Sequence, residues 1–464
     1  MLVSFFSFGY STDMQQTTSS LGTESIGKLL LRLAVPTILA QVINALYTII
    51  DRIYIGHIPG SGALALSGIG LSFPIIMLLA AFSMLIGAGG APQASIKLGQ
   101  KREEEADAIL SQAIGTLIIF AFVLILFFQI AKRPLLFAFG ASSATIEYSI
   151  DYLSIYLWGT PFVLFSLGLN PFITAQGFSR TSMMTMLLGS AVNIILDPIF
   201  IFALGWGIKG AALATVISQA VSAAWVLHFL SSKRSTLTIS YKKILPTKKV
   251  MLPVFALGIS PFFMMSTESL VNIILNSTLQ RTGGDLAVGA MSILASVMLF
   301  SLAPLQGLTQ GGQPILSYNY GAGNTERVKA AFSRILISSA LFSTTVCLIL
   351  VLFPEAVVRL FTREPLLVEK TSEAMRIFSA GFWMLGFQIA CQQAFISFSK
   401  ARISLFLASL RKIILLIPLV FLLSSHFGMR GVFLAEPIAD ILAGATTTLL
   451  FFLNFKKIIA ESGK

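Results

Sequence analysis

The chain has 464 residues, of which 55% are hydrophobic and 11% charged, and its formal net charge at pH 7 is +12. Soluble domains carry roughly 25% charged residues, and a single water-soluble core could not bury this much apolar surface. These figures exclude an ordinary soluble enzyme or nucleic-acid-binding domain. They indicate a protein of the lipid bilayer, because the basic residues lie between the apolar runs.

Hydrophobic stretches of about 20 residues, the length that an α-helix needs to cross a bilayer, recur from one end of the chain to the other. The short alternating patterns of a membrane β-barrel are absent from the sequence. We therefore expect an all-α polytopic membrane protein. Its twelve predicted transmembrane helices lie at 29–52, 63–95, 108–130, 149–176, 182–204, 208–231, 251–279, 286–319, 330–353, 372–398, 402–424 and 430–454.

The widest polar break is a basic linker at 232–250, which divides the chain into two groups of six predicted helices. We expect an N-lobe at 26–231, a C-lobe at 251–454, and tails at 1–25 and 455–464. Lys and Arg gather in the even-numbered connections and at both ends of the chain. The positive-inside rule therefore predicts a multi-pass protein of the cell inner or plasma membrane, with both termini and the linker in the cytoplasm.

The two halves resemble each other at an offset of about 220 residues. Because each half has an even number of helices, both enter the membrane in the same sense, as parallel repeats with a V-shaped central cleft between them. The matching features are "GGAPQASIKLGQ" (89–100) with "GGQPILSYNYGA" (311–322), "GIKGAALA" (207–214) with "GMRGVFLA" (428–435), Pro36 with Pro261, and Pro198 with Pro418.

The carboxylates of the first half do not recur in the second. A residue that the fold alone required should appear in both halves, so these acids need another explanation. The repeat pairs Asp51 with Asn276, Asn193 with Ile413, and Asp197 with Ile417.

We expect Asp51, Asn193, Asp197 and Thr215 to lie at a similar depth in the outer half of the N-lobe. Asn193 and Asp197 are four residues apart and share one helix face. Pro198 has no N–H, so it leaves a backbone carbonyl without its helical partner. This set suits Na⁺, and it suits equally a proton shared by two acids. The alternative for Asp197 is a structural hydrogen bond, although acids inside membrane helices are usually functional.

The predicted C-lobe has charges of its own inside apolar segments. Arg411 could form a structural ion pair with an acid such as Glu436 or Asp440, which share a face of the last helix. Glu268 could instead contact a cationic substrate. The polar and methionine side chains that could line a substrate cleft are Gln41, Asn44, Met264, Glu268, Gln388 and Gln392.

With these features the chain resembles the multidrug and toxic compound extrusion (MATE) family. The resemblance rests on the two six-helix repeats, on Pro36 followed by Asp51, on "NxxxDP" at 193–198, and on "GxxGAAxAT" at 207–215. It covers nearly all of the chain after residue 25. The region "SLRKIILLIPL" around Arg411 looks most like the Gram-positive multidrug exporters of the family.

The resemblance implies a secondary transporter, not an enzyme, that exports amphipathic and mostly cationic compounds, antibiotics among them, in exchange for H⁺ or Na⁺. It implies a cation site at Asp51, Asn193, Asp197 and Thr215, hinges at Pro36 and Pro198, and alternating access. A monomer without a cofactor is expected, with the coupling ion as its only small partner besides the substrate. Some members add a second site from a glutamate on helix 7 and an acid on helix 10, but beyond its first turn helix 10 has glutamines and no acid here.

Three other functions remain to be weighed against this one. A flippase for lipid-linked oligosaccharides or another lipid would share the architecture but need a strongly basic cleft. An intramembrane enzyme would need a Ser/His, HExxH or paired-aspartate centre, which the sequence lacks. A channel would need a repeated filter motif, and none is visible.

Overall fold

The computed structural model describes residues 20–59, 62–139, 141–143, 145–361 and 364–463. In these ranges the structure is helical and contains no strand. The first half contains α3 (Ile26–Gly56), α4 (Gly62–Gly99), α5 (Glu103–Ala138), α6 (Ile146–Trp158), α7 (Thr160–Ala175), α8 (Ser179–Pro198), the π-helical turn η1 (Ile199–Ala203), α9 (Gly207–Ser231) and the short η2 (Tyr241–Lys243). The second half contains α10 (Lys248–Gly321), α11 (Thr325–Leu352), α12 (Pro354–Val358), α13 (Pro365–Phe378), η3 (Ser379–Gly381), α14 (Phe382–Ser397), α15 (Ala401–Ser409), the π-helical η4 (Leu410–Leu416) and α16 (Ile417–Ala460).

Ten helices in the described residues are long and apolar enough to span a membrane, or eleven if α6 and α7, which meet at 60°, form one bent span. The last of these, Ala401–Ala460, covers 60 residues, and Gly428 breaks it with a φ of +57°. Gly284 breaks α10 in the same way. With the division at Gly428, these segments correspond to the twelve predicted spans, and the expected all-α fold is confirmed.

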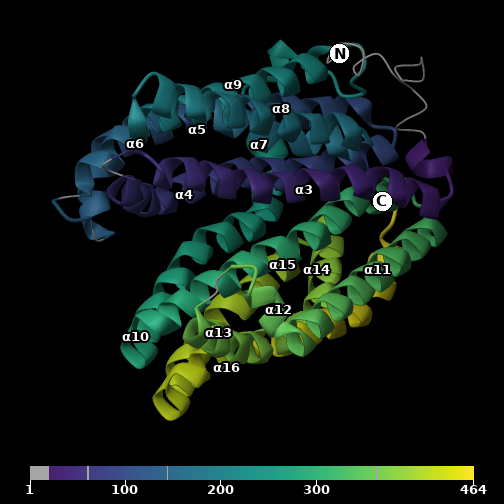
Figure 1. The fold of residues 1–464 in the computed structure, drawn as a ribbon. Coiled ribbons are helices and arrows are strands. Elements are labelled where there is room, and N and C mark those ends of the chain that lie inside the picture. Colours follow the sequence, from purple (N-terminus) through teal and green to yellow (C-terminus); the bar gives the residue numbers. More distant parts are fainter. Residues whose placement is uncertain (1–19, 60–61, 140, 144, 362–363, 464) are drawn as a thin grey trace.

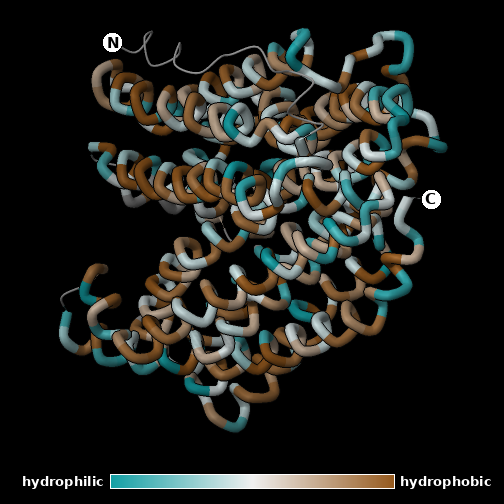
Figure 2. Tube along the Cα trace, turned by 90° about the vertical axis from the view of Figure 1, so that its right-hand side faces the viewer, coloured by the Kyte–Doolittle hydropathy of each residue, from teal (hydrophilic) through white to brown (hydrophobic). Residues whose placement is uncertain are grey.

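The helices form two groups, α3–α9 and α10–α16 (Figure 1). The groups lie close together where α3 begins and the C-terminal residues lie, and they diverge toward the opposite end. We call these the closed end and the open end. Hydrophobic residues predominate along the helices, and hydrophilic residues gather mainly at the helix ends and loops (Figure 2).

Small residues make the closed end tight. A Cβ on Gly258 of α10 would lie 1.8 Å from the carbonyl oxygen of Leu85 on α4, and a Cβ on Gly89 of α4 would lie 2.2 Å from that of Val254. Only glycine permits backbones to approach this closely. Polar contacts add to this closure, because Thr37 Oγ1 donates to the carbonyl of Gly307 at 2.8 Å.

Helix α3 belongs to both lobes. Its first half, including Leu29, Leu33 and Ala34, packs in the same buried cluster as α11, α14 and α16 of the second lobe. Near its other end, Ile55 packs in the core of the first lobe. Pro36 lies within the part that the second lobe holds, because Ile38 beyond it still packs against the same cluster.

The predicted tails and linker are partly described. Residues 1–19 of the predicted N-terminal tail lie outside the described residues, but Leu21 is fully buried, and Arg327 donates to the carbonyl of Glu24 at 2.7 Å. This part of the tail is therefore fixed to the second lobe. The linker packs along the first lobe, where the Gln112 side chain accepts from the backbone N–H of Thr247 at 2.8 Å.

We predict that Gly258→Ala will separate the lobes at the closed end, because the added methyl group would meet a backbone carbonyl rather than a flexible side chain. Overpacking of this kind costs about 1–3 kcal/mol. The measurement is the distance distribution between spin labels on the exposed residues Arg180 and Lys329. Gly289→Ala is the control, because its Cβ would make an ordinary 3.6 Å contact. An unchanged distribution in Gly258→Ala would contradict the prediction.

Candidate cation site

Three helices bring the four predicted cation-site residues together. Asp51 comes from α3, Asn193 and Asp197 from α8, and Thr215 from α9. Asn193 and Asp197 are fully buried, and Thr215 is 5% exposed. Asn193 Nδ2 lies 3.3 Å from Asp197 Oδ1 and 3.5 Å from Thr215 Oγ1. Because Asn193 and Asp197 are four residues apart on α8, the Asn193 amide contacts both Asp197 and Thr215.

The carboxyl groups of Asp51 and Asp197 are in hydrogen-bond contact. Two carboxyl groups this close repel each other when both are ionised. Either one of them keeps its proton, or a cation binds between them. Among the described residues, Asn193 Oδ1 and Asp197 Oδ2 are buried and have no hydrogen-bond partner. Buried oxygens without partners are costly, so this arrangement fits a bound H⁺ or a small monovalent cation.

Tyrosines that the sequence analysis did not select surround this group. Tyr47 and Tyr152 each share a hydrogen bond with Thr215, and Tyr152 stacks on Tyr156 with ring centroids 5.8 Å apart. Tyr47 precedes Asp51 by one helical turn, and this spacing was the one signal that could have identified it. Their rings cover the acids with apolar surface while their hydroxyl groups stay close to the site.

The helix that carries Asp197 changes its geometry directly after it. Pro198 ends α8, and the π-helical η1 follows. A proline removes one backbone donor, and π-helical turns are frequent at functional sites. The second lobe has a π-helical segment too, η4, which contains Arg411 and Lys412.

The charges of the second lobe form a buried network. Arg411 Nη2 lies 2.9 Å from Glu436 Oε1, and Arg411 Nε lies 2.6 Å from Asp440 Oδ1. Lys412 pairs with Glu268, whose side chain is 49% exposed. Both intramembrane basic residues therefore have acidic partners, and no basic cluster is left for a phosphate group in this part of the described structure.

The MatE family model matches the chain twice, at residues 36–199 and 261–422. The chain belongs to the MatE family. The two matches begin at Pro36 and Pro261, the prolines that the sequence analysis paired, so the internal repeat is also the repeat of the family.

Two relatives are multidrug export proteins MepA of staphylococci. The protein of Staphylococcus haemolyticus (strain JCSC1435) is 28% identical over 416 residues, which cover 90% of this chain and 91% of the relative. The protein of Staphylococcus aureus (strain N315) is 26% identical over 438 residues, covering 94% and 96%. The predicted likeness to Gram-positive exporters of the family is confirmed.

Solved structures share the fold. A crystal structure of MATE in complex with MaL6 has a TM-score of 0.89 at 22% identity and covers 97% of this chain and 99% of that chain. The outward-facing conformation of a multidrug resistance MATE family transporter has a TM-score of 0.86 at 22% identity, with coverage of 96% and 99%. Membership of the MatE family, together with the long apolar helices, makes this protein a multi-pass membrane transporter and not an enzyme.

The residues predicted to line a substrate cleft differ in exposure in this MatE protein. Asn44 and Glu268 are exposed, and Gln41 and Met264 are half-buried. Gln388 and Gln392 are only 4% and 6% exposed, and Gln392 Nε2 contacts Met264 Sδ at 3.3 Å. Gln41 bridges the lobes, since its Nε2 donates to Gln310 Oε1 at 2.9 Å.

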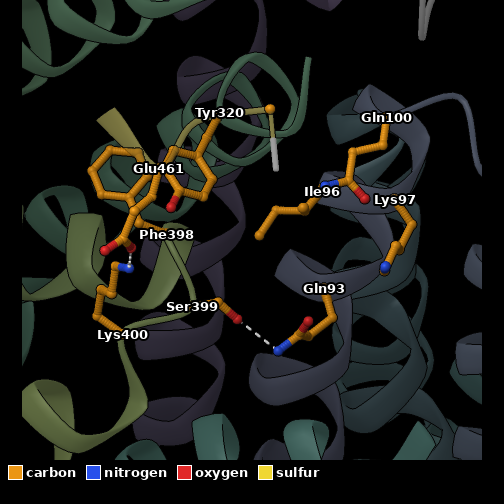
Figure 3. A pocket seen from close by; sticks show the side chains of 10 residues that line it. Gln93, Ile96, Lys97, Gln100, Tyr320, Phe398, Ser399, Lys400 and Glu461 are labelled. Carbon is orange, nitrogen blue, oxygen red and sulfur yellow. Dashed lines mark hydrogen bonds and ion pairs between the residues drawn. The ribbon is translucent and has the colours of Figure 1, made fainter. Parts of the chain in front are cut away.

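A pocket of about 390 Å³ opens at the closed end, between residues of both lobes (Figure 3). Gln93 of α4 donates to Ser399 Oγ at 2.6 Å across the lobes, and Lys400 pairs with Glu461 near the C-terminus. These residues were not predicted from the sequence. Because Gln93 and Ser399 join the lobes at the closed end, the pocket is part of the closure rather than of the cation site.

We predict that Arg411→Leu will destabilise the protein strongly. It leaves Glu436 and Asp440 buried and unpaired, and breaking a buried ion pair costs about 3–5 kcal/mol. Lys412→Ala is the matched control. The partner that it leaves, Glu268, is half exposed and can be solvated, so the cost should be about 1 kcal/mol or less. Thermal unfolding of the two purified variants provides the measurement, and equal melting temperatures would refute the prediction.

Proposed function

We propose that this protein is a cation-coupled antiporter that exports amphipathic, mostly cationic drugs and toxic compounds. The observation that carries the proposal is the buried contact between Asp51 and Asp197, with unpartnered oxygens on Asn193 and Asp197 in the described structure. Membership of the MatE family supports it. So do the multidrug export proteins MepA, which match over nearly their whole length.

The coupling ion would be H⁺ or Na⁺ at Asp51, Asn193, Asp197 and Thr215. One proton or one monovalent cation would neutralise a charge between the two carboxylates. Binding would then favour a different arrangement of α3, the helix that carries Asp51, with Pro36 and Pro198 as hinges. Coupling requires that the ion and the drug bind the two conformations with different affinities.

Alternating access would move the protein between an outward-facing and an inward-facing state. If both termini lie in the cytoplasm, as the positive-inside rule predicts, the closed end would lie inside and this conformation would be the outward-facing state. The lobes close tightly at Gly89 and Gly258, so the inward-facing state requires these contacts to separate. We expect the working unit to be a monomer.

The lipid-flippase alternative has less support. A pyrophosphate group would need basic side chains free to bind it, but Arg411 and Lys412 already pair with Glu436, Asp440 and Glu268. A half-exposed acid such as Glu268 suits a cationic drug better than an anionic lipid headgroup.

Asp197→Asn is expected to abolish export driven by an ion gradient, because it removes the charge that the coupling ion neutralises. The measurement is efflux of a fluorescent cation from proteoliposomes, with the pH gradient and the Na⁺ gradient imposed separately. Asp151→Asn is the matched control, because Asp151 forms a surface ion pair with Lys209 and is 40% exposed.

The control should transport like the unmodified protein, and Asp197→Asn should keep its melting temperature while its transport falls to that of protein-free vesicles. Transport by Asp197→Asn at the unmodified rate would overturn the assignment of the site.

A further inference from the structure

The interior of the first lobe contains buried polar side chains that the cation site does not use. On each of three helices they recur at intervals of three or four residues, so they share one face. Most are deeply buried, with Thr185 at 1%, Ser218 at 2% and Asn170 at 8% exposure. The set is Ser166, Asn170 and Thr174 on α7, Ser182 and Thr185 on α8, and Ser218 and Ser222 on α9.

Hydrogen bonds connect these side chains toward the closed end. Ser222 Oγ donates to the carbonyl of Thr185 at 3.1 Å, and Thr185 Oγ1 donates to Asn170 Oδ1 at 2.9 Å. Asn170 Nδ2 donates to the carbonyl of Ser182 at 3.4 Å, and Thr174 Oγ1 donates to Ser182 Oγ at 2.8 Å. Ser182 lies in the first turn of α8, at the closed end of the lobe.

The same row reaches the cation site at its other end. Ser218 Oγ donates to the carbonyl of Thr215 at 2.8 Å, and Thr215 contacts both Asn193 and Tyr47. A cavity of about 40 Å³ lies here, lined by Tyr47, Thr185, Ser218 and Ser222 among others. It can hold about one water molecule, whose share of liquid volume is about 30 Å³.

Buried acceptors without partners lie at the head of this row, since neither Asn193 Oδ1 nor Asp197 Oδ2 has a hydrogen-bond partner among the described residues. From Asn193 to Ser182, α8 advances about 16 Å at 1.5 Å per residue. This is about half of the roughly 30 Å hydrocarbon core of a bilayer. The row therefore extends from the buried site toward the closed end over about this distance, with the cavity between Ser218 and Thr185.

The internal repeat provides a comparison within the same chain. Gly207 at the start of α9 and Gly428 within α16 have φ values of +54° and +57°, and the matching motifs that they open, at 207–214 and 428–435, fix the register between the two halves. In this register Ser218 and Ser222 correspond to Ala439 and Ala443, which are both fully buried. Alanine thus satisfies the packing in the second lobe, and the hydroxyl groups of the first lobe need another explanation.

We propose that this row is a proton-release path through the first lobe, leading from the cation site to the closed end. The inference rests on the proposed antiport and deepens it by assigning H⁺ as the coupling ion. A hydroxyl group or water molecule can accept one proton and donate another, whereas single hydroxyl groups along a narrow row cannot surround Na⁺. One proton leaves the Asp51–Asp197 pair, each hydroxyl group or water molecule along the row takes up one and passes one on, and one reaches water beyond Ser182.

The path is closed in this conformation. Ser218 and Ser222 direct their hydroxyl protons at backbone carbonyls. Asn170 bridges Thr185 and Ser182 with an amide, which does not relay protons. The site can therefore face the open end without a proton leak, and release requires these side chains to rotate or water to bypass Asn170.

The test uses Gly189→Ala and Ser222→Ala in the full-length protein. A Cβ on Gly189 would lie 2.3 Å from Ser222 Oγ and displace the hydroxyl group, while alanine stabilises a helix by about 1 kcal/mol over glycine. Ser222→Ala removes the hydroxyl group without adding an atom. Gly70→Ala is the matched control, because its Cβ would meet nothing within 4 Å.

Two measurements separate a relay from a structural role. The first is ethidium transport in proteoliposomes driven by a pH gradient, and the second is competition between protons and ethidium for the detergent-solubilised protein. We expect both path variants to transport about 100-fold more slowly or worse, in the range typical of lost proton-transfer groups. Their proton–ethidium competition should match that of Gly70→Ala.

Path variants that transport at the control rate, or that lose the competition as well, would overturn the path. If only a Na⁺ gradient drives ethidium transport by the unmodified protein, the proton path is refuted while the antiport proposal is supported. If neither gradient drives transport, both proposals are refuted.

Discussion

The shared position of α3 is the constraint on which the two-lobed structure depends. Its first half is buried among the helices of the second lobe, and its last turns belong to the core of the first. The lobes therefore cannot move relative to each other without bending this helix or pulling its first half from an apolar core. Asp51 lies beyond Pro36 on the same helix, so a charge change at the site acts on the element that joins the lobes.

Much of the fold could be predicted from hydrophobicity, because a bilayer requires long apolar helices and the repeat shows where the chain divides. The breaks at Gly284 and Gly428 were predicted as boundaries between spans. The anchoring of Leu21 and Glu24 by Arg327 was not predicted. A polar segment before the first span has no hydrophobic period, and its partner lies about 300 residues away in the sequence.

The cation-site residues could be proposed from the sequence because an acid inside an apolar helix is rare, and the repeat showed which acids the fold did not require. The tyrosines around them could not, because aromatic residues are frequent in membrane helices and only the packing shows which ones face Asp51. The buried serines and threonines were equally hidden, because such residues often serve only to join helices. The partners of Arg411 depend on side-chain directions that the sequence does not contain.

The register set by Gly207 and Gly428 has a consequence for the second lobe. It relates Thr215 of the cation site to Glu436, whose carboxylate binds the guanidinium group of Arg411. In the second lobe the Arg411 side chain is thus a permanent cation at the place that corresponds to the cation site, where the first lobe would exchange a mobile ion. Under the proposed antiport, only the first lobe would then respond to the ion gradient. An exchange of one proton or Na⁺ for one singly charged drug moves no net charge, so the membrane voltage would contribute nothing to export and the chemical gradient of the ion would have to supply all of the driving force.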